Sequence, residues 1–368
     1  MKMKNILATM ILVLCVGLVS ACDKENNTPS FPSEKTFDMT GFARGADTGW
    51  LTEMEKSGKK FYNANGKEMD CLELLRDLGV NSIRLRVWVN PTDGWNGKQD
   101  VLAKAIRAKN LGFRIMIDFH YSDSWADPGQ QIKPAAWKGL TVDELKTAIT
   151  DHTTDVLNAL KDHGITPEWI QIGNEIRSGM LWDKDAALSG ASYDVSKDGV
   201  NYKKNIANMV TFIKAGSAAA RSVFSSAKII IHIDKGDDAN TSTWFAGILK
   251  DNNVDYDVFG LSLYPIYPAT TGDDWSAVVT KCVNNLKSIN STYGKEVMIC
   301  EVGMPVDDAA TAKECLTSLM KQTKALSYCL GVFYWEPECN SSWNDYKMGA
   351  FDDTGKPTAA MDAFAADN

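Results

Sequence analysis

The sequence is short of histidine, of paired cysteines and of positive charge. Its 368 residues include four histidines, with no His-Glu-x-x-His pattern and none in residues 41–47, where metal-dependent barrel hydrolases often carry a His-x-His pair. None of the eight cysteines forms a Cys-x-x-Cys pair, so no zinc knuckle is indicated. The 39 Lys and Arg against 47 Asp and Glu give a formal net charge of −8. That balance argues against nucleic acid as a partner, because phosphate binding needs a basic surface.

A glycine-rich nucleotide fingerprint is also missing. No Gly-x-Gly-x-x-Gly follows the first strand-like run, which removes the commonest cofactor motif of an open doubly wound sheet. What the sequence does have is 44% hydrophobic residues and many aromatic ones, with 11 Trp, 11 Tyr and 13 Phe. This composition is typical of a globular protein. Tryptophan at this density suits either a large core or a sugar-stacking cleft.

The first residues have the pattern of an export signal. Lys2 and Lys4 precede an apolar run, Ile6 to Val19, that is too short for a comfortable membrane span. The run leads into Ser-Ala-Cys22, which resembles a bacterial lipobox. We therefore expect residues 1–21 to be a lipoprotein signal peptide and Cys22 to be the lipid anchor, with an ordinary signal peptide as the alternative. The polar residues 22–40 are predicted to be a flexible tether. The Asp-Lys-Glu stretch after Cys22 resembles the surface-export signal of some bacterial lipoproteins, which implies the outer membrane and the cell surface.

Six cysteines remain once those at positions 15 and 22 are set aside. Export permits disulfides, but their wide spacing indicates no disulfide framework. We expect isolated buried thiols at Cys71, Cys282, Cys300, Cys315, Cys329 and Cys339.

Eight strand-like runs alternate with helical segments along the rest of the chain. Their starts lie 29 to 60 residues apart, which leaves room for at least one helix in every gap. Thr141-Val-Asp-Glu144 is a capping box that opens a long helix. This alternation predicts a single catalytic (β/α)8 TIM barrel of the α/β class over residues 41–368. The predicted strands are 41–47, 81–88, 113–120, 168–175, 228–234, 257–264, 296–303 and 331–337.

Polar and aromatic residues stand at the carboxyl ends of these runs, where a (β/α)8 barrel carries its active site. Period-2 alternation places Arg84, Arg86 and Trp88 on one strand face, and Asp118 and His120 on one face of the next strand. The two longest gaps follow the third and fourth runs and predict loops that wall a cleft. The residues at the strand ends are Asp47, Trp88, His120, Glu175, Asp234, Tyr264, Glu301 and Trp335.

Two of these residues, Glu175 and Glu301, predict glycoside hydrolysis. That reaction needs one carboxylic acid to protonate the leaving oxygen and one carboxylate to attack the sugar or activate water. A barrel with one glutamate on its fourth strand and another on its seventh can hold such a pair across a glycosidic bond.

Several longer motifs resemble glycoside hydrolase family 53, the arabinogalactan endo-β-1,4-galactanases of the retaining (β/α)8 clan. The resemblance spans roughly residues 42 to 365, and its most specific part is Trp-Ala-Asp-Pro-Gly-Gln-Gln at 125–131. The other matching stretches are Arg-Gly-Ala-Asp at 44–47, Asn-Ser-Ile-Arg-Leu-Arg-Val-Trp-Val-Asn-Pro at 81–91, Pro-Ala-Ala-Trp at 134–137, Gln-Ile-Gly-Asn-Glu-Ile at 171–176, Gly-Met-Leu-Trp at 179–182 and Tyr-Trp-Glu-Pro at 334–337.

The resemblance implies a role for each matched residue. Glu175 would be the acid/base and Glu301 the nucleophile, with Tyr264 orienting the nucleophile. Asn174 would bind the hydroxyl beside the anomeric carbon, and Trp335 would form the floor of the −1 subsite, where the cleaved ring binds. For Trp125 and Trp182, packing within a loop is the alternative to sugar contact. The remaining expected substrate-binding residues are Asp47, Arg84, Trp88, His120, Trp125, Asp127, Trp182 and His232.

The resemblance also implies endo-cleavage of β-1,4-galactan, and we expect a monomer without a cofactor. A same-clan hydrolase of mannan or xylan, or a non-catalytic surface glycan-binding lipoprotein, are the alternatives. The chain departs from the family at Thr48-Gly49-Trp50 and in its short connection after Glu301, where some bacterial members bind calcium. Asp307, Asp308 and Asp345 could supply oxygen ligands there, but no spaced ligand loop is visible and no metal is predicted.

Overall fold

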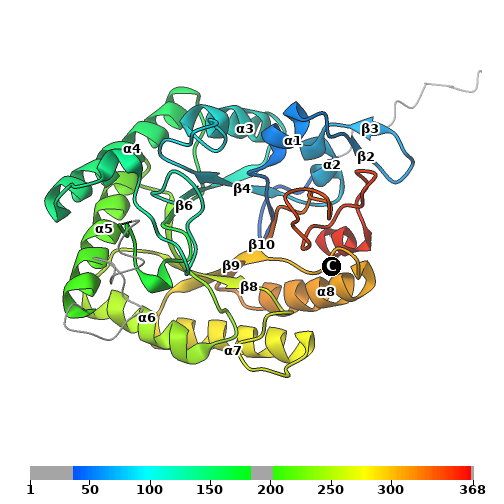
Figure 1. Ribbon diagram of the computed structural model, residues 1–368. Helices are drawn as coiled ribbons and strands as arrows, with labels where there is room; N and C mark the ends of the chain where they lie inside the picture. Colours follow the sequence, from blue (N-terminus) through cyan, green and yellow to red (C-terminus); the bar gives the residue numbers. More distant parts are fainter. Residues whose placement is uncertain (1–35, 184–201, 366–368) are drawn as a thin grey trace, which may run out of the picture. The chain divides into compact units, whose positions relative to one another are not determined.

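Eight parallel strands close into a barrel in the computed structural model, which describes residues 36–183 and 202–365 (Figure 1). Around the barrel the hydrogen-bonded order is β1-β10-β9-β8-β7-β6-β5-β4. This closed parallel ring confirms the predicted (β/α)8 barrel. The strands are β1 (Ala43–Asp47), β4 (Ser82–Val87), β5 (Arg114–Phe119), β6 (Trp169–Ile172), β7 (Lys228–Ile233), β8 (Val258–Leu263), β9 (Glu296–Val302) and β10 (Cys329–Trp335).

Helices surround the strands, and their ends follow local sequence signals (Figure 1). The predicted capping box is present, because Thr141 accepts a hydrogen bond from the Glu144 amide while the Glu144 side chain accepts from that of Thr141. Gly294 ends α7 in the left-handed conformation. The helices are α1 (Leu51–Lys56), α2 (Cys71–Asp77), α3 (Lys98–Asn110), α4 (Val142–Asp162), α5 (Tyr202–Val223), α6 (Ala239–Asp251), α7 (Trp275–Tyr293) and α8 (Ala309–Lys324).

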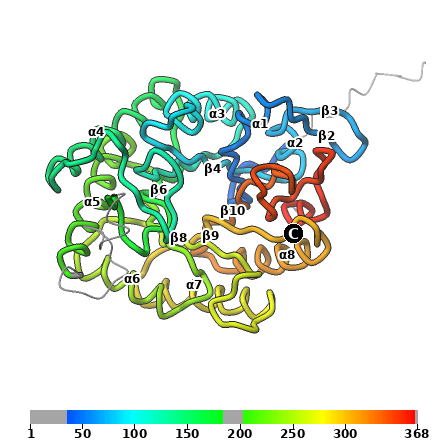
Figure 2. The backbone as a smooth tube through the Cα atoms, viewed as in Figure 1, coloured from blue at the N-terminus to red at the C-terminus, as the bar shows by residue number. Residues whose placement is uncertain are grey.

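The connection between β1 and β4 holds more than the expected helix. It contains α1, a small antiparallel pair formed by β2 (Phe61–Tyr62) and β3 (Glu68–Met69), and α2. The Tyr62 amide donates to the carbonyl of Gly355, so the C-terminal segment lies beside this pair (Figure 2). Strands of two residues leave no periodic pattern, which is why the sequence did not predict them.

An apolar plug fills part of the barrel interior. Trp169 packs edge-on against Phe333, with ring centroids 6.0 Å apart, and Gly45 leaves room for the Phe333 ring, which would lie 2.1 Å from a Cβ at that position. Such a packed interior is typical of this fold. The members of the plug are Ala43, Met116, Trp169, Ile230, Val258, Met298, Cys300 and Phe333. Polar side chains nearer the carboxyl ends of the strands are therefore free to form a site.

The compact unit that contains the barrel starts at Phe37, within the segment that was expected to be the tether. The side-chain amide of Asn81 donates to the Thr40 carbonyl, and the Arg76 guanidinium lies 4.2 Å from the centre of the Phe37 ring. These contacts attach the last residues of the predicted tether to the barrel. The predicted signal peptide and Cys22 lie outside the described residues.

Two further properties of the described residues bear on the sequence predictions. All six cysteines there are buried and free, which confirms the expectation of isolated thiols. None of the helices in residues 36–183 and 202–365 is long and apolar enough to cross a membrane.

Candidate active site

The two candidate carboxylates occupy different kinds of backbone. Glu301 is the penultimate residue of β9, and only 5% of it is exposed. Glu175 was predicted to end a strand, but β6 stops at Ile172, and Glu175 lies beyond it with φ 47° and ψ 47°. This left-handed conformation is costly for a residue with a Cβ, and such backbone strain tends to collect at functional sites. Gly173, with φ +83°, ends the strand and starts the turn that carries Glu175.

Arg84 connects Glu301 to three other groups of the site. Its Nη1 lies 2.7 Å from Asp47 Oδ2 and 2.9 Å from Glu301 Oε1. Its Nη2 lies 2.8 Å from both Asp118 Oδ2 and Asn174 Oδ1. Because both terminal nitrogens are engaged by protein groups, Arg84 acts here as a support for the nucleophile candidate.

The surroundings of Glu301 act on its pKa in opposite directions. Burial is the largest cause and raises the pKa, while the Arg84 guanidinium lowers it and the carboxylates of Asp47 and Asp118 raise it, with a result of about 7. The Tyr264 hydroxyl donates to Glu301 Oε2 over 3.3 Å, which fixes the second oxygen. Glu301 can therefore be ionised near neutral pH with both oxygens held.

The pKa of Glu175 lies well above its usual range. Burial is again the largest cause, and the negative charge of Glu301 is the next, followed by that of Asp234. A hydrogen bond with Ser262 opposes the shift but does not reverse it. Since Glu301 has a compensating arginine and Glu175 has none that outweighs its burial, the proton of the pair resides on Glu175. This division is what an acid and a nucleophile require.

A network of neutral polar groups holds the turn that carries Glu175. Asn174 donates from Nδ2 to the Ala126 carbonyl over 2.8 Å, and its Oδ1 accepts from Gln171 Nε2 over 3.2 Å. His232 lies between Asn174 Oδ1, at 3.0 Å, and Ser262 Oγ, at 2.9 Å. Burial and then the Arg84 charge lower the pKa of His232 well below its usual value, so this imidazole is neutral.

Trp88, His120 and Asp118 form a chain along one side of the site. His120 Nδ1 accepts from Trp88 Nε1 over 3.1 Å and from the Ala126 amide over 3.3 Å. The ring proton must then lie on Nε2, 3.0 Å from Asp118 Oδ2. The chain thus orients Asp118 toward Arg84.

Trp335 belongs to a group of aromatic rings. Its ring centroid lies 5.1 Å from that of Trp50, 5.7 Å from Trp125 and 4.7 Å from Tyr346. Trp125 thus lies beside the expected floor of the −1 subsite. Neither Trp50 nor Tyr346 was among the predicted site residues, because both lie in loops and no pattern marks them.

Trp182 and Asp127 lie in the loops around the site. Trp182 is 6% exposed and donates from Nε1 to the Ser178 carbonyl, which favours loop packing over sugar contact. Asp127 accepts from the Gly129 amide over 2.7 Å, and its charge acts on Glu175. Part of the loop that follows, residues 184–201, lies outside the described residues.

Two of the three acidic residues considered as calcium ligands are engaged elsewhere. Asp308 caps α8 by accepting from the Thr311 amide over 3.1 Å, and Asp345 forms an ion pair with Lys347 at 2.6 Å. Within the described ranges, His, Cys, Asp and Glu form no group of three placed to hold a metal ion. The residues present do not fit a calcium site.

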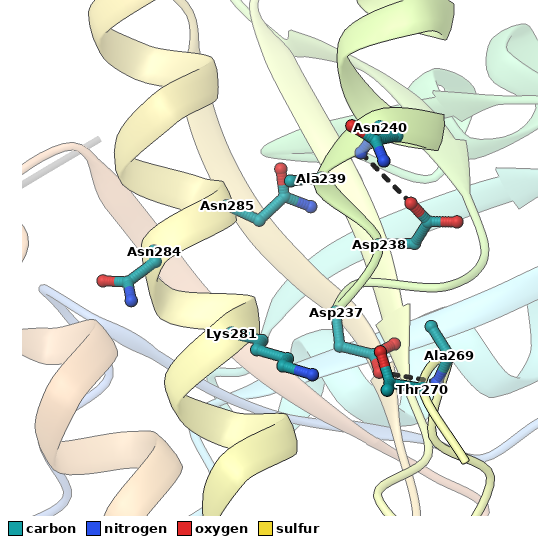
Figure 3. A pocket seen from close by; sticks show the side chains of 9 residues that line it. All are labelled: Asp237, Asp238, Ala239, Asn240, Ala269, Thr270, Lys281, Asn284 and Asn285. Carbon is teal, nitrogen blue, oxygen red and sulfur yellow. Dashed lines mark hydrogen bonds between the residues drawn. The ribbon is translucent and has the colours of Figure 1, made fainter. Parts of the chain in front are cut away.

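A polar cavity of about 540 Å³ lies between α6 and α7 (Figure 3). Lys281 and Asn285 project from α7 toward the segment that carries Asp237 and Asp238. None of the lining residues is a candidate catalytic or substrate-binding residue. This cavity is therefore separate from the carboxylate pair.

The chain is similar to known proteins over nearly its whole barrel. A family model described as glycosyl hydrolase family 53 matches residues 43–364. An arabinogalactan endo-beta-1,4-galactanase of Thermothelomyces thermophilus is 31% identical, over 87% of this chain and 98% of its own. A solved fungal beta-1,4-galactanase has a TM-score of 0.76 at 27% identity, covering 88% of this chain and 99% of its own. The catalytic domain of an Ignisphaera aggregans family 53 enzyme has a TM-score of 0.75 at 28% identity, covering 91% and 97%.

Proposed function

This chain belongs to glycosyl hydrolase family 53, and we propose that it cleaves internal β-1,4 bonds of galactan with retention of configuration at the anomeric carbon. The observation that carries this proposal is the pair Glu175 and Glu301, whose surroundings place the proton on the first and leave the second able to ionise. Two carboxyl groups with divided roles are the requirement of glycoside hydrolysis.

In the first step, Glu301 attacks the anomeric carbon while Glu175 gives its proton to the glycosidic oxygen. The bond between that carbon and oxygen breaks, the leaving sugar departs as an alcohol, and Glu301 becomes the ester of a glycosyl-enzyme. The donor from Tyr264 and the ion pair with Arg84 hold the attacking carboxylate in place.

In the second step the roles reverse. Esterified Glu301 carries no charge, so the repulsion that kept Glu175 protonated disappears and Glu175 becomes a carboxylate base. It takes a proton from water as the water oxygen attacks the anomeric carbon, and Glu301 leaves as a carboxylate. A retaining enzyme needs its two carboxyl groups about 5 Å apart, with no room for a water on the nucleophile's side.

Galactan is the proposed substrate because two relatives named as arabinogalactan endo-beta-1,4-galactanases are 31% and 29% identical to this chain, over 87% and 99% of its length. The test is to incubate the purified protein with galactan, mannan and xylan and to follow product sizes over time. We expect an early spread of galacto-oligosaccharides, with Glu301→Gln as the inactive control. Release of galactose alone, or action on mannan or xylan instead, would contradict the proposal.

We further propose that Cys22 anchors the protein to the bacterial outer membrane at the cell surface. The Val-Ser-Ala-Cys sequence and the polar residues after it support this, and the several acyl chains of a bacterial lipoprotein make a stable anchor. Cys22→Ser should move the protein out of the membrane fraction, whereas Cys15→Ser, within the apolar run, should not. A membrane-bound Cys22→Ser protein would refute the anchor.

We also propose that the protein is a monomer, since Glu175, Glu301 and all their described partners come from one chain. Light scattering of a Cys22→Ser protein tests this through the mass in solution. A mass of two chains or more would contradict it.

A further inference from the structure

A second pair of buried glutamates follows Trp335, and nothing in the mechanism above uses it. Glu336 is fully buried, and Glu338 is 1% exposed. Glu336 forms an ion pair with Nη1 of Arg86 and accepts the Trp50 amide hydrogen, with distances of 3.2 and 3.1 Å to its two oxygens. Its own backbone is left-handed, with φ 49°. Glu336 is thus a well-partnered carboxylate held at a strained position directly after the expected floor of the −1 subsite.

Glu338 has no such partners. Within residues 36–183 and 202–365, no N–H or O–H group of another residue is seen to donate a hydrogen bond to either of its carboxyl oxygens. The Glu336 carboxyl is within hydrogen-bonding reach of Glu338 and raises its pKa. Two carboxyl groups can share a hydrogen bond only when one of them is protonated. A buried carboxylate without any donor is too costly to persist when it can take up a proton instead.

The charges around Glu338 also disfavour its ionisation. The other groups that act on it or on Glu336 come from four elements: Asp47 on β1, Arg86 on β4, Cys71 on α2 and Lys104 on α3, with Cys339 next in sequence. Lys104 pairs with Asp100, and Arg86 is already paired with Glu336 and Asp47. No positive charge among these groups is left for Glu338.

Arg86 links this acidic pair to the aromatic rings. Its guanidinium carbon lies 4.5 Å from the ring of Trp125, 5.3 Å from Trp50, 5.5 Å from Trp88 and 5.8 Å from Trp335. Its Nε and Nη2 have no hydrogen-bond partner in the described part of the chain, so the rings are their surroundings. The ion pair with Glu336 therefore decides where this cation lies against the rings.

We propose that Glu338 is a neutral acid that donates its proton to the carboxylate of Glu336, and that the series Glu338, Glu336 and Arg86 positions the tryptophan floor of the −1 subsite. Glu338 acts through Glu336 and Arg86, so it is a positioning residue. The proposal concerns the reaction of the proposed function and adds a determinant of sugar binding.

The direction of the shifts agrees with a shared proton. Burial, and next the charge of Glu336, raises the pKa of Glu338 well above its usual range. Burial raises the pKa of Glu336 to about 7, although Arg86 opposes it. When Glu338 loses its proton to solvent at alkaline pH, a second negative charge appears beside Glu336. Glu336 then loses a donor and gains a repelling neighbour, and Trp335, bonded to it, must shift.

The test compares two variants by their KM for galactan. Glu338→Met keeps the length of the side chain but removes the donor, so we expect its KM to rise about fivefold at every pH, the loss of one cation–π contact. Glu338→Gln keeps an N–H donor and cannot ionise, so it should rescue most of that loss. Wild-type KM should rise at alkaline pH while that of Glu338→Gln stays flat. Glu314→Gln, at an exposed position on α8, is the control.

The proposed function and the positioning role fail in different ways. If the proposed function is wrong, neither the wild type nor any variant turns over galactan. An infrared measurement is independent of activity and of the Met variant's folding. In a Glu175→Gln background at neutral pH, the carbonyl stretch of a protonated carboxyl group should be present and should weaken on adding Glu338→Gln. An unchanged band, or a Glu338→Gln protein whose KM rises with pH as in the wild type, would overturn the proposal.

Discussion

Replacing Glu301 with Gln should abolish hydrolysis and, at neutral and alkaline pH, make the protein more stable. Glu301 is buried among groups that disfavour its ionised form, and its pKa is raised from 4.5 to about 7. Arg84 does not depend on Glu301 for neutralisation, because Asp47 and Asp118 also pair with it. A glutamine carbonyl can still accept from Arg84, so the substitution removes a charge with little change of shape.

The sign and size of the effect follow from proton linkage. Between pH 4.5 and about 7 the folded protein holds a proton on Glu301 that the unfolded chain has lost, so the wild-type free energy of unfolding falls as pH rises through that window. The full shift corresponds to about 3 kcal/mol. Glu301→Gln has no such loss. Its advantage over wild type should be absent below pH 4.5, grow up to about pH 7, and then level off at about 1–3 kcal/mol.

The assay is denaturant unfolding of both proteins at several pH values from 4 to 8, with activity on galactan measured in parallel. Glu296→Gln is the matched control, since Glu296 begins the same strand and is half-buried in a pair with Lys228. It should show no gain that grows with pH. A Glu301→Gln protein that is less stable than wild type at pH 8, or equally stable at all pH values, would show that ionised Glu301 does not destabilise the fold.

Three further predictions test other parts of the site. Glu175→Ala should lose most activity on substrates with poor leaving groups and regain some when azide, which needs no base, is added; no rescue by azide would contradict its role as acid/base. Gly49→Ala should lower the free energy of unfolding by about 1–3 kcal/mol, because the Cβ of the new alanine would lie 2.1 Å from Arg86 Nη1. The control is Gly247→Ala in α6, where a Cβ meets only ordinary contacts, and this change should be neutral or stabilising. Arg84→Lys should move the acidic limb of the kcat/KM profile to higher pH, since a weaker positive neighbour lets burial raise the pKa of the nucleophile further; an unmoved limb would contradict this.

The sequence was sufficient for the barrel because each strand carries its own signal. Glu301 was placed at a strand end by a run of β-branched and apolar residues, and β9 ends one residue beyond it. Glu175 was assigned to a strand because it follows closely on the strand-like run that ends at Ile172. In the structure that strand ends at Ile172, because the positive φ of Gly173 turns the chain away from the strand direction. The turn requires glycine, since a Cβ at this position would lie 2.5 Å from the Ile176 side chain.

The supports of the site were less predictable because they depend on contacts between distant segments. Trp50, which donates its amide hydrogen to Glu336, is 286 residues away from it in sequence. Arg86 was placed on the correct strand face. The four tryptophan rings around its guanidinium, however, come from three separate loops and one strand end. Local patterns carry no information on such contacts.

The stereochemistry of galactan cleavage is the most direct test of the central claim, which is that Glu301 attacks the sugar and Glu175 serves first as acid and then as base. The measurement is the anomeric proton of freshly released product, followed by NMR before mutarotation mixes the anomers. Two successive displacements return the anomeric carbon to its starting configuration. Attack by Glu301 therefore predicts that the β anomer appears first. If the α anomer appears first, water has attacked directly, and the assignment of Glu301 as nucleophile is wrong.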